Sequence, residues 1–188
     1  MGSDDGLSTT SYAVLGLLTF ADGMSGYDVM KLAEQSIGHF WAPAKSHVYS
    51  ELRRLATGGY ATERRVEQST RPNKRIYSIT PEGRTALERW LTEAPIRPAP
   101  VKSVVTLKVF FGHLIPAPAL TAQVRDVRRR TEEHLTELRA IEEQIKDDEA
   151  LLYPYLTLRA GLAHVQADID WTDEVLAELD RREAHGSR

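Results

Sequence analysis

Apolar residues follow helical spacing through the start of the chain and are interrupted by short turn-forming segments. The stretch SYAVLGLLTF, residues 11–20, is apolar on most sides and predicts a buried first helix. After the turn ADGMSG, Ser25 and Asp28 fit an S-x-x-D capping box at the start of a second helix over 27–36, which Gly38 ends. Two helices joined by a tight turn are therefore expected at the beginning of the fold.

A third helix is predicted between Pro43 and the double glycine at 58–59. Proline suits the first position of a helix, and Val48, Leu52 and Leu55 repeat at i, i+4 and i+7 to form an inward face. The glycines end the helix and turn the chain.

Two segments with strand-like composition follow. TERRVEQ (62–68) and KRIYSIT (74–80) are rich in β-branched and aromatic residues and flank the turn-forming STRPN, which predicts a β-hairpin. Their alternation is imperfect, so the inward register of the hairpin stays open.

Thr80 and Pro81 form an N-terminal signal for a fourth helix over 82–93. Its apolar residues on one side are Leu87, Trp90 and Leu91. Three helices, a hairpin and a closing helix are the order of a winged helix-turn-helix domain, which is expected over 7–93.

Three prolines within APIRPAP, residues 94–100, predict a linker and a second domain over 101–184. The first segment of that domain, 101–116, suits a strand by its β-branched residues and a helix by its spacing. A helix is expected because no partner strand is visible nearby. The apolar positions on its face are Val104, Leu107, Phe111 and Leu114.

Two longer amphipathic patterns complete a mainly α-helical second domain. The first is a long helix with apolar positions from Leu120 to Ile145, whose other faces carry RDVRRR and EEHLTE. The second steps by four and three residues as a heptad seam: Leu158, Leu162, Val165, Ile169, Thr172, Leu176 and Leu179. Such a seam needs a second apolar seam, in the same chain or in a second copy. Apart from Thr172, its members are the expected dimerisation residues.

Composition indicates a folded protein without disulfides. Of the 188 residues 41% are apolar, enough for a core, and the lack of cysteine excludes disulfides, thiolate metal sites and cysteine nucleophiles. The longest apolar runs fall short of the roughly 20 residues that a membrane span needs, and no basic leader precedes them. A cytoplasmic protein without membrane contact is therefore expected.

The net charge of −3 hides an uneven distribution. Between Ala42 and Trp90, ten Lys or Arg face five Asp or Glu, whereas from Ile96 onward thirteen face sixteen. Basic charge therefore gathers around the third helix and the hairpin, which is typical of a local patch for nucleic acid.

The polar side of the third helix and the hairpin carry groups that suit DNA. Hydroxyls, a phenol and cations reach phosphate oxygens and base edges, and one helix fits the major groove. Cations on a hairpin can lie along the backbone or enter the minor groove. The expected DNA-contacting residues are Lys45, Ser46, His47, Tyr49, Ser50, Arg53 and Arg54 on the helix, and Arg64, Arg65, Arg71, Asn73, Lys74 and Arg75 on the hairpin. As alternatives, the helix could present an ordinary solvated face, and the hairpin could be a charged sheet edge. Each alternative explains its own element, but together they explain less well why both elements occur in this order.

Several ordered motifs together resemble the PadR family of bacterial transcriptional regulators. They are Leu-Gly-Leu-Leu in the first helix, Ser-Gly-Tyr at the second, Phe-Trp before the third, V-Y-x-x-L-x-x-L-x-x-x-G-Y, and Y-x-I-T-P-E-G-R. The resemblance covers about residues 7–92. LKVFFGHLIP and WTDEVLAEL resemble the longer helical C-terminal domain of the phenolic-acid-repressor subfamily and the tail of a virulence-activator group. The sequence RLATGG departs from the family's frequent Glu-containing stretch, which alters the surface beside the hairpin.

The resemblance implies a homodimer whose C-terminal helices clasp each other and present two winged helices to a palindromic operator. The usual member is a repressor released by a small ligand, and activators belong to the same family. Two-fold symmetry would place two half-sites about one helical turn apart.

A small aromatic or hydrophobic effector is also implied. In the phenolic-acid branch it sits between the winged helix and the C-terminal helices. The candidate residues for this site are Tyr12, His39, Phe40, Trp41, Phe111, His113, Tyr155 and His164. Aromatic residues at a domain junction are also ordinary core residues, so this alternative stays open.

No motif predicts an enzyme, a cofactor or a metal. The chain has no phosphate loop, no G-x-S-x-G elbow and no dinucleotide fingerprint. His47 with Glu51 and His164 with Asp168 have the i, i+4 spacing of metal ligands, but two ligands do not make a site. The competing hypotheses are a winged-helix module that docks a protein, and a small-molecule binding protein, which leaves the basic hairpin unexplained.

Overall fold

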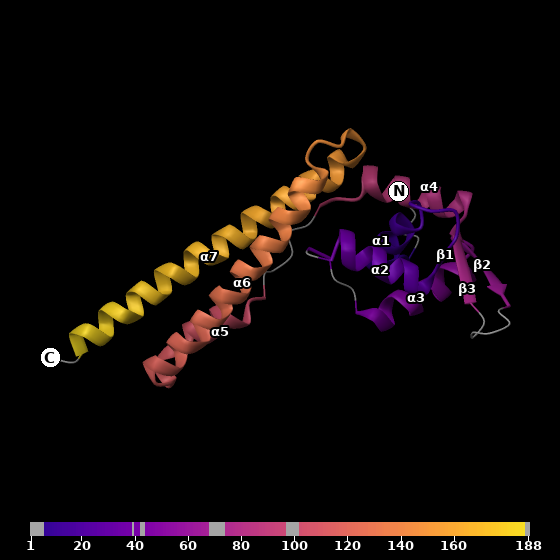
Figure 1. The fold of residues 1–188 in the computed structure, drawn as a ribbon. Coiled ribbons are helices and arrows are strands. Elements are labelled where there is room, and N and C mark those ends of the chain that lie inside the picture. Colours follow the sequence, from indigo (N-terminus) through magenta and orange to yellow (C-terminus); the bar gives the residue numbers. More distant parts are fainter. Residues whose placement is uncertain (1–5, 39, 42–43, 68–73, 97–101, 187–188) are drawn as a thin grey trace. The chain divides into compact units, whose positions relative to one another are not determined.

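The computed structural model of the chain describes residues 6–38, 40–41, 44–67, 74–96 and 102–186. It divides into two compact units, Met1–Arg97 and Pro98–Arg188 (Figure 1). None of the described helices combines the length and the apolarity that crossing a bilayer requires.

The first unit combines four helices with a small antiparallel sheet. In chain order its elements are α1 (Thr9–Leu17), β1 (Met24–Ser25), α2 (Gly26–Ser36), α3 (Lys45–Thr57), β2 (Ala61–Val66), β3 (Lys74–Ile79) and α4 (Pro81–Glu93). The sheet has the order β1-β3-β2, so the predicted hairpin forms and β3 lies at its centre. This is the predicted winged helix-turn-helix.

Side-chain caps set the starts of two helices. At α2, Ser25 Oγ accepts a hydrogen bond from the Asp28 amide at 3.2 Å, and Asp28 Oδ2 accepts one from the Ser25 amide at 3.0 Å, which confirms the capping box. At α4, Thr80 Oγ1 accepts from the Gly83 amide at 3.0 Å. By contrast, α3 begins at Lys45 after Ala44, two residues later than predicted. Pro43 itself lies outside the described residues.

The strand β1 was not predicted, because two residues are too short to show alternation. Met24 and Ser25 were expected within a turn, but they pair with Tyr77 and Ile76 on the open side of β3. The new strand ties the start of α2 to the centre of the sheet.

One core holds this unit together. Its buried apolar residues include Val14, Leu15, Leu18, Val29, Val48, Leu52, Leu55, Tyr77, Ala86 and Leu87. Removing such side chains from water is the main favourable term in folding. Leu91 was predicted on the same side of α4 as Leu87 and Trp90; Leu87 is buried, whereas Leu91 is 65% exposed.

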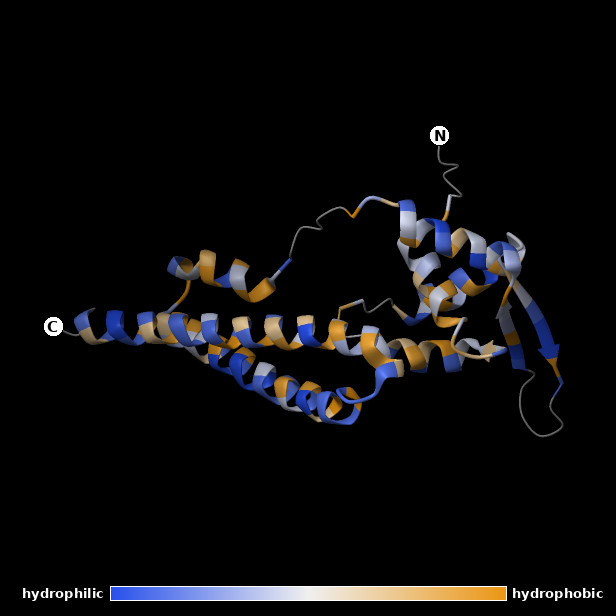
Figure 2. Cartoon of the chain, turned by 90° about the horizontal axis from the view of Figure 1, so that it is seen from above, coloured by the Kyte–Doolittle hydropathy of each residue, from blue (hydrophilic) through white to orange (hydrophobic). Residues whose placement is uncertain are grey.

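The second unit is an antiparallel pair of long helices preceded by a short one. Its elements are α5 (Val104–Phe110), η1 (Gly112–Leu114), α6 (Ala117–Ile145), η2 (Glu149–Leu151) and α7 (Leu152–Gly186). The prediction of a helix within 101–116 is therefore confirmed for α5. Its predicted face is exposed in the single chain, with Val104 70% and Leu107 57% exposed, and α5 is largely orange in Figure 2.

The heptad seam of α7 packs against α6 of the same chain, and the two helices run side by side in Figures 1 and 2. Leu158, Ile169 and Thr172 of the seam are buried, as are Leu135 and Leu138 of α6. The seam was expected to pack against a second apolar seam in the same chain or in a second copy, and α6 of the same chain provides such a partner. The assignment of the seam residues to a dimer interface stays a prediction.

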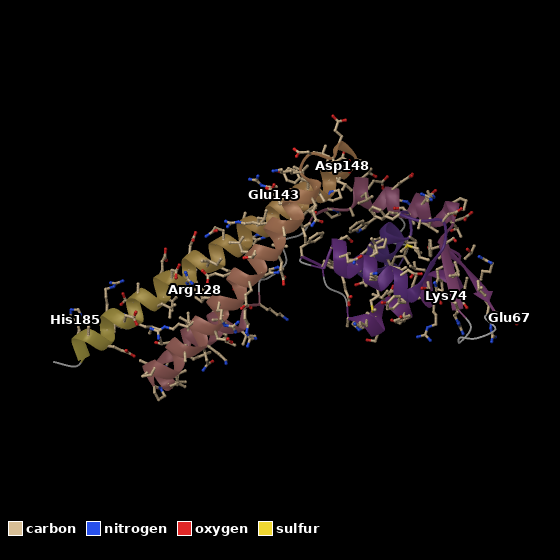
Figure 3. The ribbon with its side chains drawn as sticks, viewed as in Figure 1. Glu67, Lys74, Arg128, Glu143, Asp148 and His185 are labelled. Atoms are coloured by element: carbon tan, nitrogen blue, oxygen red, sulfur yellow. The ribbon has the colours of Figure 1, made fainter. Side chains whose placement is uncertain are left out.

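Ion pairs between α6 and α7 match the antiparallel register. Arg128 binds Asp173 through a bidentate contact, and Arg125 Nη2 lies 3.5 Å from Asp180 Oδ1. The hydrogen bond from Arg128, which is labelled in Figure 3, lowers the pKa of Asp173. The basic RDVRRR segment therefore pairs with acidic residues of the facing helix, and is only partly a solvated face.

Candidate nucleic-acid interface

The two sides of α3 have opposite characters, as its sequence predicts. Val48, Leu52 and Leu55 are almost fully buried against the rest of the unit. The residues predicted to contact DNA are all exposed: Lys45, Ser46, His47, Tyr49, Ser50, Arg53 and Arg54. The apolar side thus holds the helix in place and leaves the polar side open to a ligand.

Tyr49 lies on the exposed side of α3, and its ring also contacts the start of α2. Its ring lies directly over Gly26 at the start of α2, since a Cβ on Gly26 would come within 2.4 Å of Tyr49 Cε1. The tyrosine is nevertheless 41% exposed. Gly26 therefore allows the two helices of the helix-turn-helix to approach closely while the phenol stays accessible.

Two of the side chains predicted to contact DNA bond to the backbone of their own helix. Ser50 Oγ donates to the His47 carbonyl at 2.9 Å, and Arg53 Nε donates to the Tyr49 carbonyl at 3.3 Å. These bonds hold the side chains along the helix surface, and both residues remain exposed.

Arg54 differs because its guanidinium is bound within the unit. It donates to the Gly6 carbonyl at 3.1 Å, to Glu51 Oε2 at 3.1 Å and to Ser11 Oγ. Glu51 also accepts from Ser11 Oγ at 2.6 Å. Arg54 would have to exchange these bonds to contact DNA, so its predicted role is the least supported on this helix.

The described part of the wing, strands β2 and β3, presents cations on both of its faces. Arg65 pairs across the ladder with Arg75, whereas Arg64 pairs with Ile76 one residue along. Since neighbouring strand residues point to opposite faces, Arg64 and Arg65 lie on opposite sides of the hairpin. Their role as DNA-contacting residues stays a prediction. Of the remaining predicted wing residues, Arg71 and Asn73 lie outside the described part of the chain.

Besides Arg54, which binds Glu51, three of the described cations predicted to contact DNA are paired with carboxylates of other elements. Lys45 Nζ lies 3.4 Å from Glu34 Oε1, Lys74 Nζ 3.1 Å from Asp28 Oδ2, and Arg75 Nη1 2.9 Å from Glu63 Oε1. Figure 3 labels Lys74 at the start of β3. These pairs join α3 to α2, the wing to α2, and β3 to β2.

Asp28 has the most bonds of these three carboxylates. Its pKa is lowered mainly by the hydrogen bond from Ser25, with a smaller contribution from Lys74. Sequence analysis found its capping role but none of the three pairs. The pair of Glu63 and Arg75 could have been found from the hairpin register, because the two residues lie diagonally across neighbouring strands.

The predicted effector residues fall in both units. Tyr12 is a core residue, 8% exposed, and stacks on Trp90 with ring centroids 4.9 Å apart. Phe40 and Trp41 are exposed on the segment before α3. His39 lies outside the described residues.

In the second unit the remaining candidates are spread out. Phe111 contacts Phe110 edge to face at 5.0 Å, Tyr155 Oη accepts from Arg159 at 3.4 Å, and His164 is exposed on α7. His113 alone among the described candidates lines a groove of about 660 Å³.

This groove lies within the second unit, and sequence analysis missed most of it. Its lining is mainly apolar and comes from the α5–η1 segment, the start of α6 and the second half of α7, including Leu120, Trp171, Val175 and Leu179. The four-residue spacing of Trp171, Val175 and Leu179 was a signal for a second apolar stripe on α7.

The histidine–carboxylate spacings do not develop into metal sites among the described residues. Glu51 bonds to Ser11 and Arg54, and no group of three potential ligands converges anywhere in the described part of the chain.

Two family models match the chain, one for each unit. The model described as "Transcriptional regulator PadR-like family" matches residues 14–89, and the model described as "Virulence activator alpha C-term" matches residues 101–180. The two ranges follow the winged helix and the helical second unit.

Full-length relatives show the same similarity. The chain is 28% identical to the negative transcriptional regulator PadR of Bacillus subtilis over 177 residues, which cover 90% of this chain and 97% of that protein. It is 30% identical over 172 residues to a Mycobacterium tuberculosis protein described as a probable transcriptional regulator, covering 84% and 91%.

Solved structures share the whole fold. Bacillus subtilis PadR in complex with operator DNA has a TM-score of 0.80 at 27% identity, covering 92% of this chain and 99% of that one. The same protein in complex with p-coumaric acid has a TM-score of 0.73 at 26% identity, with the same coverage.

Proposed function

Because the chain belongs to the PadR-like family of transcriptional regulators, we propose that it is a dimeric, operator-binding repressor. Each copy places the exposed side of α3 in the major groove and the β2–β3 wing along the adjacent backbone. One observation carries the proposal: the exposed side of α3 holds cations, hydroxyls and a phenol, while its apolar side is buried. Such a regulator acts on chromosomal DNA and is therefore cytoplasmic.

The residues proposed to touch DNA divide by task. Lys45, Ser46, His47, Tyr49 and Ser50 lie in the first half of α3 and would meet base edges, and Arg53 would bind a phosphate. Arg64, Arg65, Lys74 and Arg75, with Arg71 and Asn73, would contact the backbone from the wing. Arg54 is kept as a secondary contact because its present bonds lie within the unit.

The dimer is proposed to form through the second unit. In the single chain this unit leaves large apolar side chains exposed on α5 and the first turns of α7, including Leu107, Phe110 and Leu156. The partly buried seam residues Leu162, Val165, Leu176 and Leu179 would be covered further by a second copy. Two-fold pairing would then present two α3 helices to a palindromic site.

Release by a small aromatic or hydrophobic effector is part of the proposal. It is supported by the complex of the Bacillus subtilis relative with p-coumaric acid. The predicted effector residues remain proposals, and the groove beside His113 adds Trp171 as a candidate.

The experiment is a gel shift of duplex DNA from the region upstream of the protein's own gene, at 50 and 200 mM salt. We expect a shift that weakens steeply with salt, since phosphate contacts release counterions. Adding p-coumaric acid tests release in the same gel. The absence of any shift at low salt would contradict the DNA-binding proposal.

A matched pair of variants assigns the shift to α3. Arg53→Ala removes a charge-assisted phosphate contact, and we expect about 10- to 100-fold weaker binding. Arg139→Ala on α6 removes the same charge elsewhere, and its affinity should stay near that of the wild type. Gel filtration should show dimers for both variants, and monomers for Arg53→Ala would mean that α3 was misassigned.

A second candidate is a winged-helix module that docks a protein. The exposed apolar residues Phe40 and Trp41 before α3 favour it. Apolar docking would persist at high salt, which the two-salt comparison would show. Activation in place of repression is a further alternative, favoured by the match of the second unit to a virulence-activator model.

A further inference from the structure

The proposed DNA-contacting surface contains its own counter-charges. Around α3 and the wing, three cations of the proposed contact set each face a carboxylate of another element at 2.9 to 3.4 Å. The partners differ in position: Glu34 lies in the last turn of α2, Asp28 in its first turn, and Glu63 in β2. Two elements, α2 and β2, therefore place acids beside cations of the proposed contact set.

These pairs do little for the stability of the fold. Lys45 and Glu34 are 70% and 56% exposed, and ion pairs that open to water contribute little because solvent screens them. Glu63 is more enclosed at 28% exposure, but its partner Arg75 is 59% exposed. The presence of these pairs therefore needs an explanation other than the stability of the fold.

A phosphate that approaches these cations meets charges that a carboxylate already neutralises in part. Lys45, Lys74 and Arg75 each either release the carboxylate or bind the phosphate beside it through another N–H. In both cases the carboxylate stays beside the negatively charged backbone and repels it. Both effects oppose binding to DNA of any sequence, because they depend on charge and not on base identity.

We propose that Glu34, Glu63 and Asp28 restrain DNA binding by occupying Lys45, Arg75 and Lys74 in the free protein. The inference rests on the proposed function and adds to it a restraint on binding to the DNA backbone. The carboxylates compete with backbone phosphates, so contacts to base edges must supply more of the binding free energy. Asp28 has a second task, since it also caps α2.

The test uses the full-length protein and two charge-neutralising variants, Glu34→Gln and Glu63→Gln. Asp28→Asn is left out because it would also weaken the cap of α2. The probe is a fluorescent 30-base-pair duplex of arbitrary sequence, and its anisotropy is followed at several salt concentrations. We expect each variant to bind about two- to fivefold more tightly than the wild type, a range set by exposed ion pairs. The slope of log affinity against log salt should become steeper by up to about 0.9.

Two controls separate local pairing from net charge. Glu93→Gln, at the exposed end of α4, changes the net charge equally and should leave affinity within about 1.5-fold of the wild type. In a Lys45→Ala background, Glu34→Gln should lose most of its effect, because its competitor for phosphate is gone. Circular dichroism melts verify that every variant is folded.

The outcomes separate the inference from the proposed function. If the wild type does not bind the duplex at low salt, the proposed DNA binding fails and this inference fails with it. If the wild type binds but Glu34→Gln and Glu63→Gln bind no more tightly than Glu93→Gln, the restraint is refuted while DNA binding stands. An equal gain in all three variants would likewise show net charge alone and overturn the inference.

Discussion

At the scale of single residues, the contact between Gly26 and Tyr49 links packing to function. The glycine lets the Tyr49 ring lie over the start of α2, and the ring still reaches the surface. Sequence analysis found both residues, as Ser-Gly-Tyr and as part of the third-helix motif. It could not show that they touch, because contact between two helices depends on their packing angle and not on either motif alone.

Gly26→Ala should therefore impair DNA binding more than folding. A Cβ would lie 2.4 Å from Tyr49 Cε1, so the ring must move, and a flexible side chain can do so. We expect affinity for operator DNA to fall by about two- to tenfold, the range for one lost hydrogen bond. The free energy of unfolding, from urea titration, should change by less than about 1 kcal/mol.

The double variant with Tyr49→Ala provides the control. Once the ring is absent, Gly26→Ala should cause no further loss of affinity. If it weakens binding equally with and without the ring, the effect does not pass through Tyr49.

At the scale of elements, the junction between the sheet and α4 depends on another close approach. Thr80 donates its amide to the Tyr60 carbonyl at 3.1 Å and caps α4, while Gly83 lies against the same carbonyl. A Cβ on Gly83 would come within 2.1 Å of Tyr60 O. Thr80 and Pro81 predicted the helix start to within one residue, 82 against the observed 81, but they gave no reason for the glycine at 83.

Gly83→Ala should accordingly destabilise the first unit. The obstructing atom is backbone and cannot rotate away, so the helix start must shift, at a cost of about 1–3 kcal/mol in the free energy of unfolding. Urea or thermal unfolding measures it. Gly16→Ala in α1 is the matched control: nothing lies within 4 Å of its Cβ, so it should be neutral or stabilising by up to about 1 kcal/mol. Equal behaviour of the two variants would contradict the argument.

Element boundaries show where sequence reasoning reached its limit. Strong caps at Ser25 and Thr80 made the starts of α2 and α4 predictable. The start of α3 was not, because Ala44 makes no side-chain cap and the proline before it suggested an earlier start. The exposure of Leu91 was also hidden, since helical spacing gives a face but not how far a neighbour covers it.

At the scale of the whole molecule, two compact units serve two proposed tasks. The first reads DNA and the second joins copies. Motif order predicted the winged helix well, because caps, turns and apolar spacing all indicated the same fold. The effector site was less accessible to prediction, because its candidates were chosen by residue type, and among the described ones only His113 lines the groove of the second unit.

Hydroxyl-radical footprinting of the shifted upstream fragment tests the central claim, a dimer that places two α3 helices on DNA, most directly. We expect two protected half-sites of related, inverted sequence, with centres about one helical turn, roughly 10 base pairs, or a whole multiple apart. The Arg53→Ala variant should protect the same two half-sites, but only at a higher protein concentration than the wild type. A single protected patch without symmetry, or a shifted complex that protects no defined sequence, would contradict the account.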